Sequence, residues 1–374
     1  MRGVATFQDK CIDGHLLVAS LLGLFKQRGL DCDKVLRGTG IFVIDMTKTE
    51  HFVSAKQLLR LIDNALAMWP SGDLSFLLGQ LWLPSQSGPL TAGMFCAKDV
   101  NELGRFWHQY HWLTHPWLQC WRWQGESEWH FLLSLDLGTQ RHQQFFIELS
   151  LSSLVSTCKQ LMGEGWQGSI CFPYRTPSHL AQYYKYFGSD IRFEAPFCRV
   201  SMSYTFMMQP LLFYRRTASG ELAPTNSSVE FHLSHKIEPG ERLTFTPNAA
   251  ATEFALHAIS KPVRRQWRQA PFRLGFAASI RLTLMRKTMT LPQLAQHMGL
   301  SPATVKRRLA EMDLTFGQLV DETRLLKALY RLSSGDIPAE TIADSLDFSD
   351  ASNFRRSFKR WTGQLPRHFR CWLA

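Results

Sequence analysis

Basic side chains recur at helical spacing in two short segments near the end of the 374-residue chain. Lys306 and Arg307 project from one predicted helix, and Arg355, Arg356 and Lys359 project from another. A helix with Lys and Arg on one face can donate hydrogen bonds to the phosphates and guanine edges of duplex DNA. The same pattern also fits a solvated face of an ordinary helical bundle, so the surrounding elements must decide between these interpretations.

Each basic segment forms the second helix of a predicted helix-turn-helix pattern that is written twice, over 291–312 and over 341–360. The copies align without gaps at a separation of forty-eight residues, which places Ser301 on Ser349. Because serine is a good N-cap, we expect these two residues to open the second helices. An offset repeat of this kind indicates two similar supersecondary units.

A buried stripe and an exposed face can be assigned to both second helices at about 100° per residue. Apolar residues at three-to-four spacing predict the buried stripes, namely Val305, Leu309 and Met312 in the first copy and Phe354, Phe358 and Trp361 in the second. The opposite faces carry Ala303, Lys306, Arg307 and Ala310 in the first copy and Ser352, Arg355, Arg356 and Lys359 in the second. All of these residues except Ala310 are predicted DNA contacts.

The net charge of +11 is confined to the last third of the chain. Residues 261–374 contain twenty Lys plus Arg and nine Asp plus Glu, whereas residues 1–260 contain twenty-two of each. A basic surplus in the segment with the doubled helix-turn-helix is the electrostatic signature of a polyanionic partner. We therefore predict that this segment binds double-stranded DNA.

The first 210 residues mix helical and strand patterns. Apolar spacing predicts helices at 15–28, 54–69, 99–113, 143–162 and 177–187, and alternation predicts a hairpin at 117–136 and strands at 167–172, 191–193 and 199–204. We expect an α+β domain at 1–210, then an insertion and interdomain linker at 211–272. An all-α domain follows at 273–374, in which a long helix at about 315–332 joins the two helix-turn-helix motifs. Within the insertion and linker, short alternation predicts an added hairpin of 229–233 with 242–245, and a helical pattern covers 249–268.

Residues 106–131 hold six tryptophans and four histidines. His108, His111 and His115 fall near one helical face, so a metal site is one interpretation. An aromatic-lined pocket for a small, largely apolar effector is the second, and its candidate residues are Arg105, Tyr110, Trp121, Trp123 and Trp129. The third is core packing, which we favour for each tryptophan taken alone. We predict a pocket somewhere in the first domain and no resident metal or cofactor.

Eight cysteines are scattered, with no pair at the two- to four-residue spacing that metal and redox sites favour. No segment approaches twenty apolar residues, and Asp9, Lys10 and Asp13 interrupt the N-terminal segment. We therefore expect a cytoplasmic, nucleoid-associated protein without membrane contact. The sequence has no nucleophile elbow, phosphate loop or activated cysteine, which argues against an enzyme.

Three segments of the last hundred residues carry a family pattern: LAQHMGLSPATVKRRL, FGQLVDETRLLKALYRL and IADSLDFSDASNFRRSFKRWTGQLPRHFR. They resemble the DNA-binding domain of the AraC/XylS family of bacterial transcription regulators. In the second copy the signature positions are Phe348, Phe354, Phe358, Lys359, Gly363, Pro366 and Arg370. Asp347 departs from the glycine usual in the family's turn, and the turn should survive because Asp tolerates a left-handed backbone.

This resemblance implies a set of base-facing residues, namely Ala303, Lys306 and Arg307 in the first copy and Ala351, Ser352 and Arg356 in the second. We add Ser301 to the predicted DNA contacts, since it opens the first of these helices. If both second helices contact one face of the duplex, they should lie about one helical turn, roughly 34 Å, apart.

Two segments of the first domain, QFFIELSLSSLVSTCKQLMG and ICFPYRTPSHLAQYYKYFGSDIRFEAPFCRVSMSYTFMMQPL, are similar to the family's "arabinose-binding" type of sensor domain. The similarity implies an effector site or a dimerisation surface, and it does not imply arabinose as the ligand. We expect a regulator of transcription that binds promoter DNA, responds to a small-molecule effector, and has RNA polymerase and a second copy of itself as partners. The alternatives are a DNA-binding protein whose first domain only dimerises and an enzyme fused to a DNA-binding domain.

Overall fold

The computed structural model describes residues 8–10, 12–48, 51–82, 94, 97–111, 114–125, 127–135, 140–162, 165–195, 197–211, 214–216, 219, 222–224, 229–231, 243–245, 276–312, 314–333, 337–362 and 364–368. We call residues 8–211 the N-terminal part and residues 276–368 the C-terminal part. Among the described residues, no helix has the length and apolar character needed to cross a membrane.

A five-stranded sheet with the order β3-β4-β7-β5-β6 forms the centre of the N-terminal part. Neighbouring strands are antiparallel except β5 and β6, which are parallel. The strands are Leu118–Gln124 (β3), Glu128–Leu135 (β4), Gly168–Cys171 (β5), Ile191–Arg192 (β6) and Cys198–Ser203 (β7). Their pairing confirms the predicted hairpin and strands.

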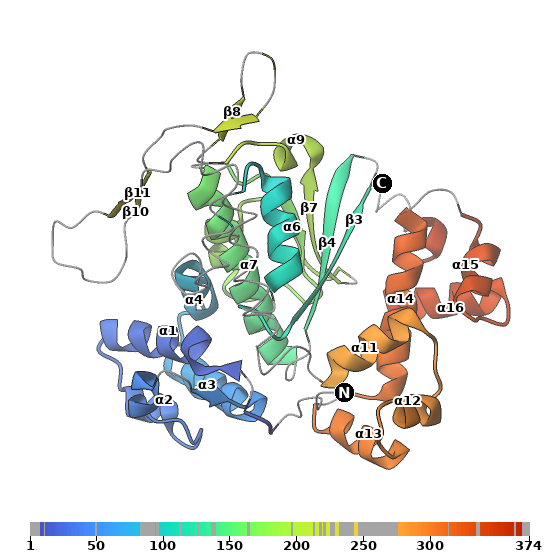
Figure 1. The fold of residues 1–374 in the computed structure, drawn as a ribbon, viewed down its shortest axis with the longest axis horizontal. Helices are drawn as coiled ribbons and strands as arrows, with labels where there is room; N and C mark the ends of the chain where they lie inside the picture. Colours follow the sequence, from blue (N-terminus) through green and yellow to red (C-terminus); the bar gives the residue numbers. More distant parts are fainter. Residues whose placement is uncertain are drawn as a thin grey trace.

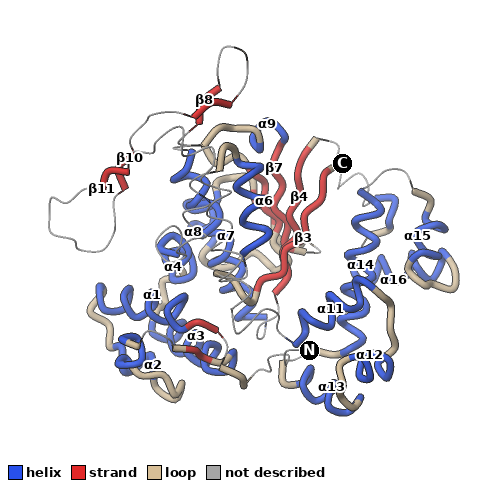
Figure 2. The backbone as a smooth tube through the Cα atoms, in the orientation of Figure 1, coloured by secondary structure: helices blue, strands red, loops and turns tan. Residues whose placement is uncertain are grey.

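The sheet separates two apolar environments, because successive residues of a strand point to opposite faces. Phe131 and Leu133 of β4 belong to the main core of the N-terminal part, whereas Leu132 between them belongs to a core of the C-terminal part. Figures 1 and 2 show the corresponding arrangement, with α6 (Val100–Tyr110) and α7 (Gln140–Met162) on one side of β3, β4 and β7 and α14 (Phe316–Ser333) on the other.

Helix α7 packs closely along α4 (Leu74–Trp82). Gly79 of α4 permits this contact, because a Cβ atom at that position would lie 2.5 Å from the carbonyl oxygen of Leu149. The sequence analysis did not predict α4, whose apolar residues lack a clear amphipathic period. The remaining helices of the N-terminal part are Gly14–Gln27 (α1), Cys32–Leu36 (α2), Val43–Thr47 (η1), Ala55–Met68 (α3), Leu180–Phe187 (α8) and Tyr204–Met207 (α9).

Three short antiparallel pairs complete the strands of the described residues. They are β1 (Ile12–Asp13) with β2 (Phe52–Val53), β8 (Tyr214–Arg216) with β9 (Leu222–Pro224), and β10 (Val229–Phe231) with β11 (Leu243–Phe245). The last pair confirms the hairpin predicted within the insertion. The helix predicted over 249–268 and the domain boundary at 272 lie outside the described residues, so the domain division stays a prediction.

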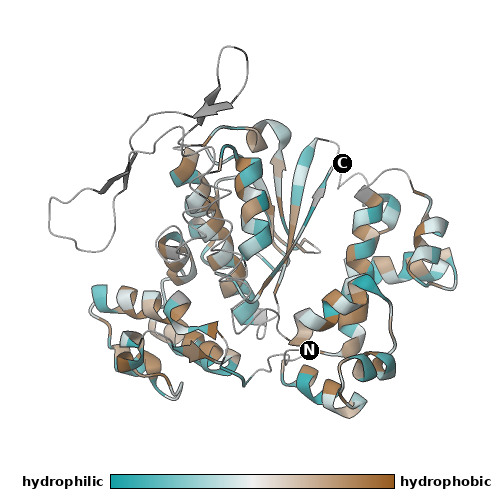
Figure 3. Ribbon diagram, viewed as in Figure 1, coloured by the Kyte–Doolittle hydropathy of each residue, from teal (hydrophilic) through white to brown (hydrophobic). Residues whose placement is uncertain are grey.

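The C-terminal part is entirely helical where it is described. Its helices are Phe276–Arg286 (α11), Leu291–His297 (α12), Pro302–Ala310 (α13), α14, Ala339–Ser345 (α15) and Ala351–Thr362 (α16). Helix α14 belongs to two apolar cores: Leu319 packs with α11, α12 and α13, and Leu329 packs with α15 and α16. Figure 3 shows hydrophilic and hydrophobic residues mixed along these helices, as expected of amphipathic helices around small cores. This arrangement confirms the α+β and all-α fold classes and the joining helix.

Candidate nucleic-acid interface

The first helix-turn-helix motif consists of α12, a tight turn and α13. A capping box closes the start of α12, in which the Thr290 N–H donates to Gln293 Oε1 at 2.9 Å. Gly299 adopts φ +67° in the turn, a backbone conformation that glycine tolerates best. Ser301 then caps α13, because its Oγ accepts a 3.1 Å hydrogen bond from the Thr304 N–H. The predicted cap of this helix is confirmed.

The second motif repeats the turn with a different residue at its centre. Asp347 adopts φ +58°, at the position that Gly299 occupies in the first motif. The Phe348 N–H donates to the Ala343 carbonyl at 3.1 Å, as the Leu300 N–H donates to the Ala295 carbonyl in the first motif. The turn therefore survives without glycine, as predicted.

The gapless alignment of the two copies is wrong beyond this turn. Asp350, and not Ser349, caps α16, because the Asn353 N–H donates to Asp350 Oδ1 at 2.7 Å. One additional residue separates the turn from the second helix in the second copy. The buried pair Val305 and Leu309 accordingly corresponds to Phe354 and Phe358 at an offset of forty-nine residues. The counterpart of Arg307 is therefore Arg356, and that of Thr304 is Asn353.

The basic faces lie on the surface, opposite these buried stripes. Eight of the nine predicted DNA contacts are exposed, namely Ser301, Ala303, Lys306, Arg307, Ser352, Arg355, Arg356 and Lys359, and Ala351 is half-buried. The periodicity argument thus separated buried from exposed residues correctly, although the alignment of the copies was shifted by one residue. These residues lie on α13 and α16, except Ser301, which caps α13, and their contacts with DNA stay a prediction.

The arginines of the two faces have different intramolecular partners. Arg307 Nη1 donates to Glu311 Oε1 at 3.1 Å, one turn further along α13. Arg355 Nη2 donates to Glu340 Oε1 of α15 at 2.7 Å. These pairs are exposed to solvent, where ion pairs stabilise a fold by only about 0.2–1 kcal/mol. They orient the side chains and can be exchanged for phosphate contacts at little cost.

The side chains of Lys306 and Lys359 form no hydrogen bond or ion pair with any residue that the structure describes. Their ammonium groups are solvated and can move on flexible stems. Lysine in this state is suited to phosphate binding as a point charge.

The joining helix α14 fixes the two motifs in one unit. The guanidinium of Arg281 on α11 is nearly fully buried, and its Nε donates to Glu322 Oε2 of α14 at 2.7 Å. Lys327 Nζ donates to the Leu284 carbonyl at 2.9 Å, and Arg324 lies over the Phe348 ring at 4.9 Å. These contacts tie α14 to α11 and to the turn of the second motif.

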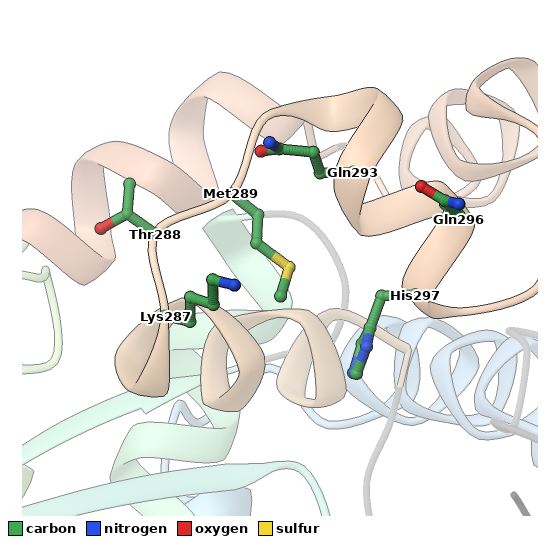
Figure 4. Close-up of a pocket in the computed structure, with 6 residues that line it drawn as sticks. All are labelled: Lys287, Thr288, Met289, Gln293, Gln296 and His297. Atoms are coloured by element: carbon green, nitrogen blue, oxygen red, sulfur yellow. The ribbon is translucent and has the colours of Figure 1, made fainter.

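A solvent-open groove lies beside the first motif, between the end of α11 and α12. Figure 4 shows the six residues that line it, which are Lys287, Thr288, Met289, Gln293, Gln296 and His297. All of the lining residues except Met289 are polar or charged, and none of the predicted DNA contacts belongs to the groove. The sequence analysis did not single out this groove, because its residues come from a loop and from the face of α12, and no spacing between the two marks a site.

The candidate effector residues of the N-terminal part do not converge on one site. Trp121 pairs with Leu132 across the hairpin and packs against the core of the second motif, whereas Trp129 lies on the opposite face of the sheet. Tyr110 is buried in the main core, and Arg105 is exposed on α6. The Trp123 side chain lies outside the described residues. A single pocket formed by these five residues is therefore not supported by their placement.

Trp129 is instead covered by a guanidinium from the neighbouring strand. The Arg122 guanidinium lies 3.8 Å from the centre of the Trp129 ring, a cation–π contact. Its Nη2 also donates to Asn101 Oδ1 at 2.5 Å. The Trp129 ring and the Arg122 guanidinium are thus both engaged within the fold.

The three histidines considered as metal ligands make hydrogen bonds to nearby oxygen atoms. His108 Nε2 lies 3.0 Å from the Cys120 carbonyl oxygen, and His111 Nε2 lies 3.0 Å from that of Leu118. Burial lowers the pKa of His111 to about 4 and that of His115 to about 3, which keeps both rings neutral at pH 7. Within the described ranges, no three or more His, Cys, Asp or Glu side chains are grouped to hold a metal ion.

One polar cluster in the N-terminal part was not predicted. The buried carboxylate of Glu148 on α7 accepts hydrogen bonds from Gln144 Nε2 at 2.9 Å and from the Tyr183 and Ser75 hydroxyls. His179 Nε2 lies 3.2 Å from the same carboxylate. Burial raises the pKa of Tyr183, so its phenol stays protonated and can donate. No sequence motif marks this cluster, whose members come from three separate helices and a loop.

Comparisons with known proteins cover both parts of the chain. A family model described as the arabinose-binding domain of AraC transcription regulators, N-terminal, matches residues 29–211. A helix-turn-helix domain model matches residues 294–371. The first match covers most of the N-terminal part, and the second covers most of the two motifs described above.

Several bacterial regulators are similar in sequence. The chain is 25% identical over 250 residues to the ornithine utilization regulator of Pseudomonas aeruginosa, covering 66% of this chain and 62% of that protein, so the match spans less than two thirds of that relative. It is 40% identical over 76 residues to the regulator VqsM of the same species, covering 20% of this chain and 23% of VqsM. It is 22% identical over 350 residues to an uncharacterized HTH-type transcriptional regulator of Mycobacterium tuberculosis, covering 92% of each chain.

Among solved structures, the transcriptional regulator CdpR from Pseudomonas aeruginosa is similar over 94% of this chain and 97% of that chain, with 14% identity and a TM-score of 0.40.

Proposed function

Because this chain belongs to the AraC family of bacterial transcription regulators, we propose that it binds promoter DNA through the exposed faces of α13 and α16. The observation that carries the proposal is the pair of helices that each combine a buried apolar stripe with an exposed basic face. The confinement of the basic surplus to residues 261–374 supports the same partner. We assign the chain no enzymatic activity, and its role would place it in the cytoplasm, at the nucleoid.

The two helices are proposed to enter successive major grooves on one face of the duplex. The joining helix α14 has eighteen residues and therefore extends about 27 Å at 1.5 Å per residue. This length is compatible with recognition helices separated by roughly 34 Å, the pitch of B-DNA. One chain would then contact an asymmetric half-site, and a homodimer would contact two.

Individual residues take different roles in this proposal. Arg307 and Arg356 have the planar donor pattern that matches guanine O6 and N7. Lys306, Arg355 and Lys359 are assigned to phosphates. The small side chains of Ala303, Ala351 and Ser352 permit close approach of the helices to the bases, and Ser301 holds the start of α13 beside them.

The N-terminal part is proposed to bind a small, largely apolar effector and to convey its presence through the sheet. Leu132 on β4 is buried in one apolar cluster with Leu329 and Ala328 of α14, and Trp121 and Phe197 pack at its edge. A ligand that shifts the sheet in one conformational state changes this contact, and its effect is limited by its differential affinity for the two states. RNA polymerase is the proposed protein partner on the promoter.

Binding-site selection with the full chain and a pool of randomised duplexes tests the DNA-binding proposal. We expect enrichment of two short elements whose centres lie about 10–10.5 base pairs apart. Folded protein that enriches no sequence would contradict the proposal. Enrichment of a single element would contradict the joint use of α13 and α16.

Mass spectrometry of small molecules retained through purification identifies candidate effectors. Each candidate is then added to the full chain on the selected duplex. A change in DNA affinity supports regulation through the N-terminal part. An affinity that no candidate changes, and that removal of residues 1–210 also leaves unchanged, would reject this regulation. The DNA-binding proposal would then still stand.

A further inference from the structure

Asn353 lies in the first turn of α16, three residues before Arg356, and it was not among the predicted DNA contacts. Its side-chain amide is engaged on both sides. The Nδ2 group donates to Asp350 Oδ2 at 2.8 Å and to Ser349 Oγ at 2.5 Å. The Oδ1 atom accepts a hydrogen bond from Arg356 Nη2 at 2.5 Å. Asn353 thus links the N-cap of the recognition helix to its arginine.

This linkage fixes the orientation of the amide. An asparagine amide has two donors and one acceptor oxygen, and here the oxygens of Asp350 and Ser349 accept from both donors. The oxygen is thereby turned toward Arg356. The hydrogen bonds from the Asn353 and Ser352 backbone lower the pKa of Asp350, so the carboxylate that anchors the amide is ionised at pH 7.

The linkage also leaves Arg356 able to contact a base. A guanidinium carries five N–H donors, and the bond to Asn353 uses one of them. Bidentate recognition of guanine requires two donors directed to O6 and N7. Arg356 is exposed, so its remaining donors face solvent, and its side chain is held before any DNA is present.

The first motif provides an internal contrast at the equivalent positions. Thr304 stands where the second motif has Asn353, and its hydroxyl lies 2.9 Å from the Oγ of the cap residue Ser301. Thr304 has no recorded contact with Arg307, which instead donates to Glu311 toward the end of α13. A series of hydrogen bonds therefore links the cap to the arginine in the second motif. Among the described residues of the first motif, no such series is found.

We propose that Asn353 is a positioning residue that holds Arg356 for base recognition and makes α16 the more selective of the two recognition helices. The proposal rests on the proposed function, in which Arg356 contacts a base. Asn353 itself touches no base, because its amide is committed to Asp350, Ser349 and Arg356. It acts by restricting the rotamers of Arg356.

Binding-site selection with full-length variants tests this role. Asn353→Thr introduces the residue that the chain itself uses at this position of α13, so α16 keeps a residue compatible with a helix start. We expect Arg356→Ala to reduce discrimination at one base pair by roughly 5- to 150-fold. Asn353→Thr should reduce discrimination at that same base pair by a smaller factor than Arg356→Ala, on the order of 5-fold. Discrimination at the base pairs contacted by α13 should not change.

Thr304→Ala is the matched control, since it removes the equivalent side chain, which contacts Ser301 and no arginine among the described residues. It should leave base discrimination unchanged. Affinity for random-sequence duplex and its salt dependence provide a second readout, because they depend on phosphate contacts. Asn353→Thr should preserve both, whereas a merely structural loss of α16 would lower affinity for all sequences.

The outcomes separate the two proposals. If Arg356→Ala changes a base preference and Asn353→Thr does not, the positioning role is overturned and the DNA-binding face stands. If neither variant changes any preference while thermal unfolding shows both to be folded, Arg356 contacts no base, and the proposed face of α16 is wrong.

Discussion

In the first helix-turn-helix motif Arg307 bonds to Glu311 further along its own helix, whereas in the second Arg356 bonds back to Asn353 at the helix start. Helix α13 is capped by the neutral side chain of Ser301, and α16 is capped by the carboxylate of Asp350. Two motifs that bury equivalent stripes therefore hold their arginines against different partners. The comparison teaches that a shared fold does not imply a shared role at the DNA.

The cores behind the two motifs differ as well. The core of the first motif contains only residues of the C-terminal part, and the buried Arg281 ties it to Glu322 of α14. The core of the second motif includes Leu132 of the sheet, with Trp121 and Phe197 at its edge. We infer that a conformational change in the N-terminal part affects the second motif first, through α14. It affects the first motif only indirectly.

The largest expected effect comes from truncating the sheet residue behind the second motif. Leu132→Ala should lower the free energy of unfolding by about 2–5 kcal/mol, because it removes a nearly fully buried side chain. Hydrogen exchange should accelerate in the amides of α15 and α16 and remain unchanged in α12 and α13.

Leu133→Ala is the matched control, since Leu133 is equally buried on the opposite face of the same strand. Its stability loss should be similar, with exchange accelerated in the N-terminal part and unaltered in α15 and α16. Equal acceleration in both motifs after Leu132→Ala would show that the second motif is not selectively coupled to the sheet.

The next effect concerns the arginines of the two faces. Arg307→Ala and Arg356→Ala should each weaken specific binding by roughly 1–3 kcal/mol if they contact bases. Arg360→Ala is the control, because it removes the same charge from α16 at a residue outside the predicted DNA contacts. Arg360 Nη2 donates instead to Asp321 Oδ2 of α14 at 3.0 Å. A titration on the selected duplex at several salt concentrations checks this. Equal losses in all three variants would indicate that only net charge matters.

The smallest effect is expected in the turns. Gly299→Ala places a Cβ on a left-handed residue and should destabilise the first motif by about 1–2 kcal/mol. Asp347→Gly removes the corresponding strain and adds freedom to the unfolded chain, so a change within about 1 kcal/mol is expected. Thermal unfolding measures both. A large loss in Asp347→Gly would mean that the aspartate carboxylate, and not its backbone, stabilises the turn.

The fold and the basic faces could be predicted from the sequence because helical periodicity is local. Val305 and Leu309 mark one buried stripe, and Phe354 and Phe358 mark the other, without knowledge of tertiary contacts. The inserted residue could not be predicted, because Ser349 and Asp350 are both good N-caps and either fits the pattern. The role of Asn353 could not be predicted for a related reason, since a short polar residue in a first turn indicates only the start of a helix.

The effector residues could not be predicted because aromatic composition does not determine which face of a sheet a side chain occupies. Trp121 and Trp129 are close in sequence, but the register of β3 with β4 sends them to opposite faces. Similarly, Glu148 meets Ser75 and Tyr183 only after three helices have packed together. Such sites depend on long-range packing, which no single segment encodes.

Methylation interference at guanine N7 tests the central claim most directly, because N7 lies in the major groove. The full chain is bound to its selected duplex, and the same measurement is made with Arg356→Ala. We predict interference at guanines in two successive major grooves on one face, with the signal in one groove lost in Arg356→Ala and the other retained. Interference in a single groove, or an identical pattern for both proteins, would contradict the assignment of α13 and α16 as two distinct recognition helices.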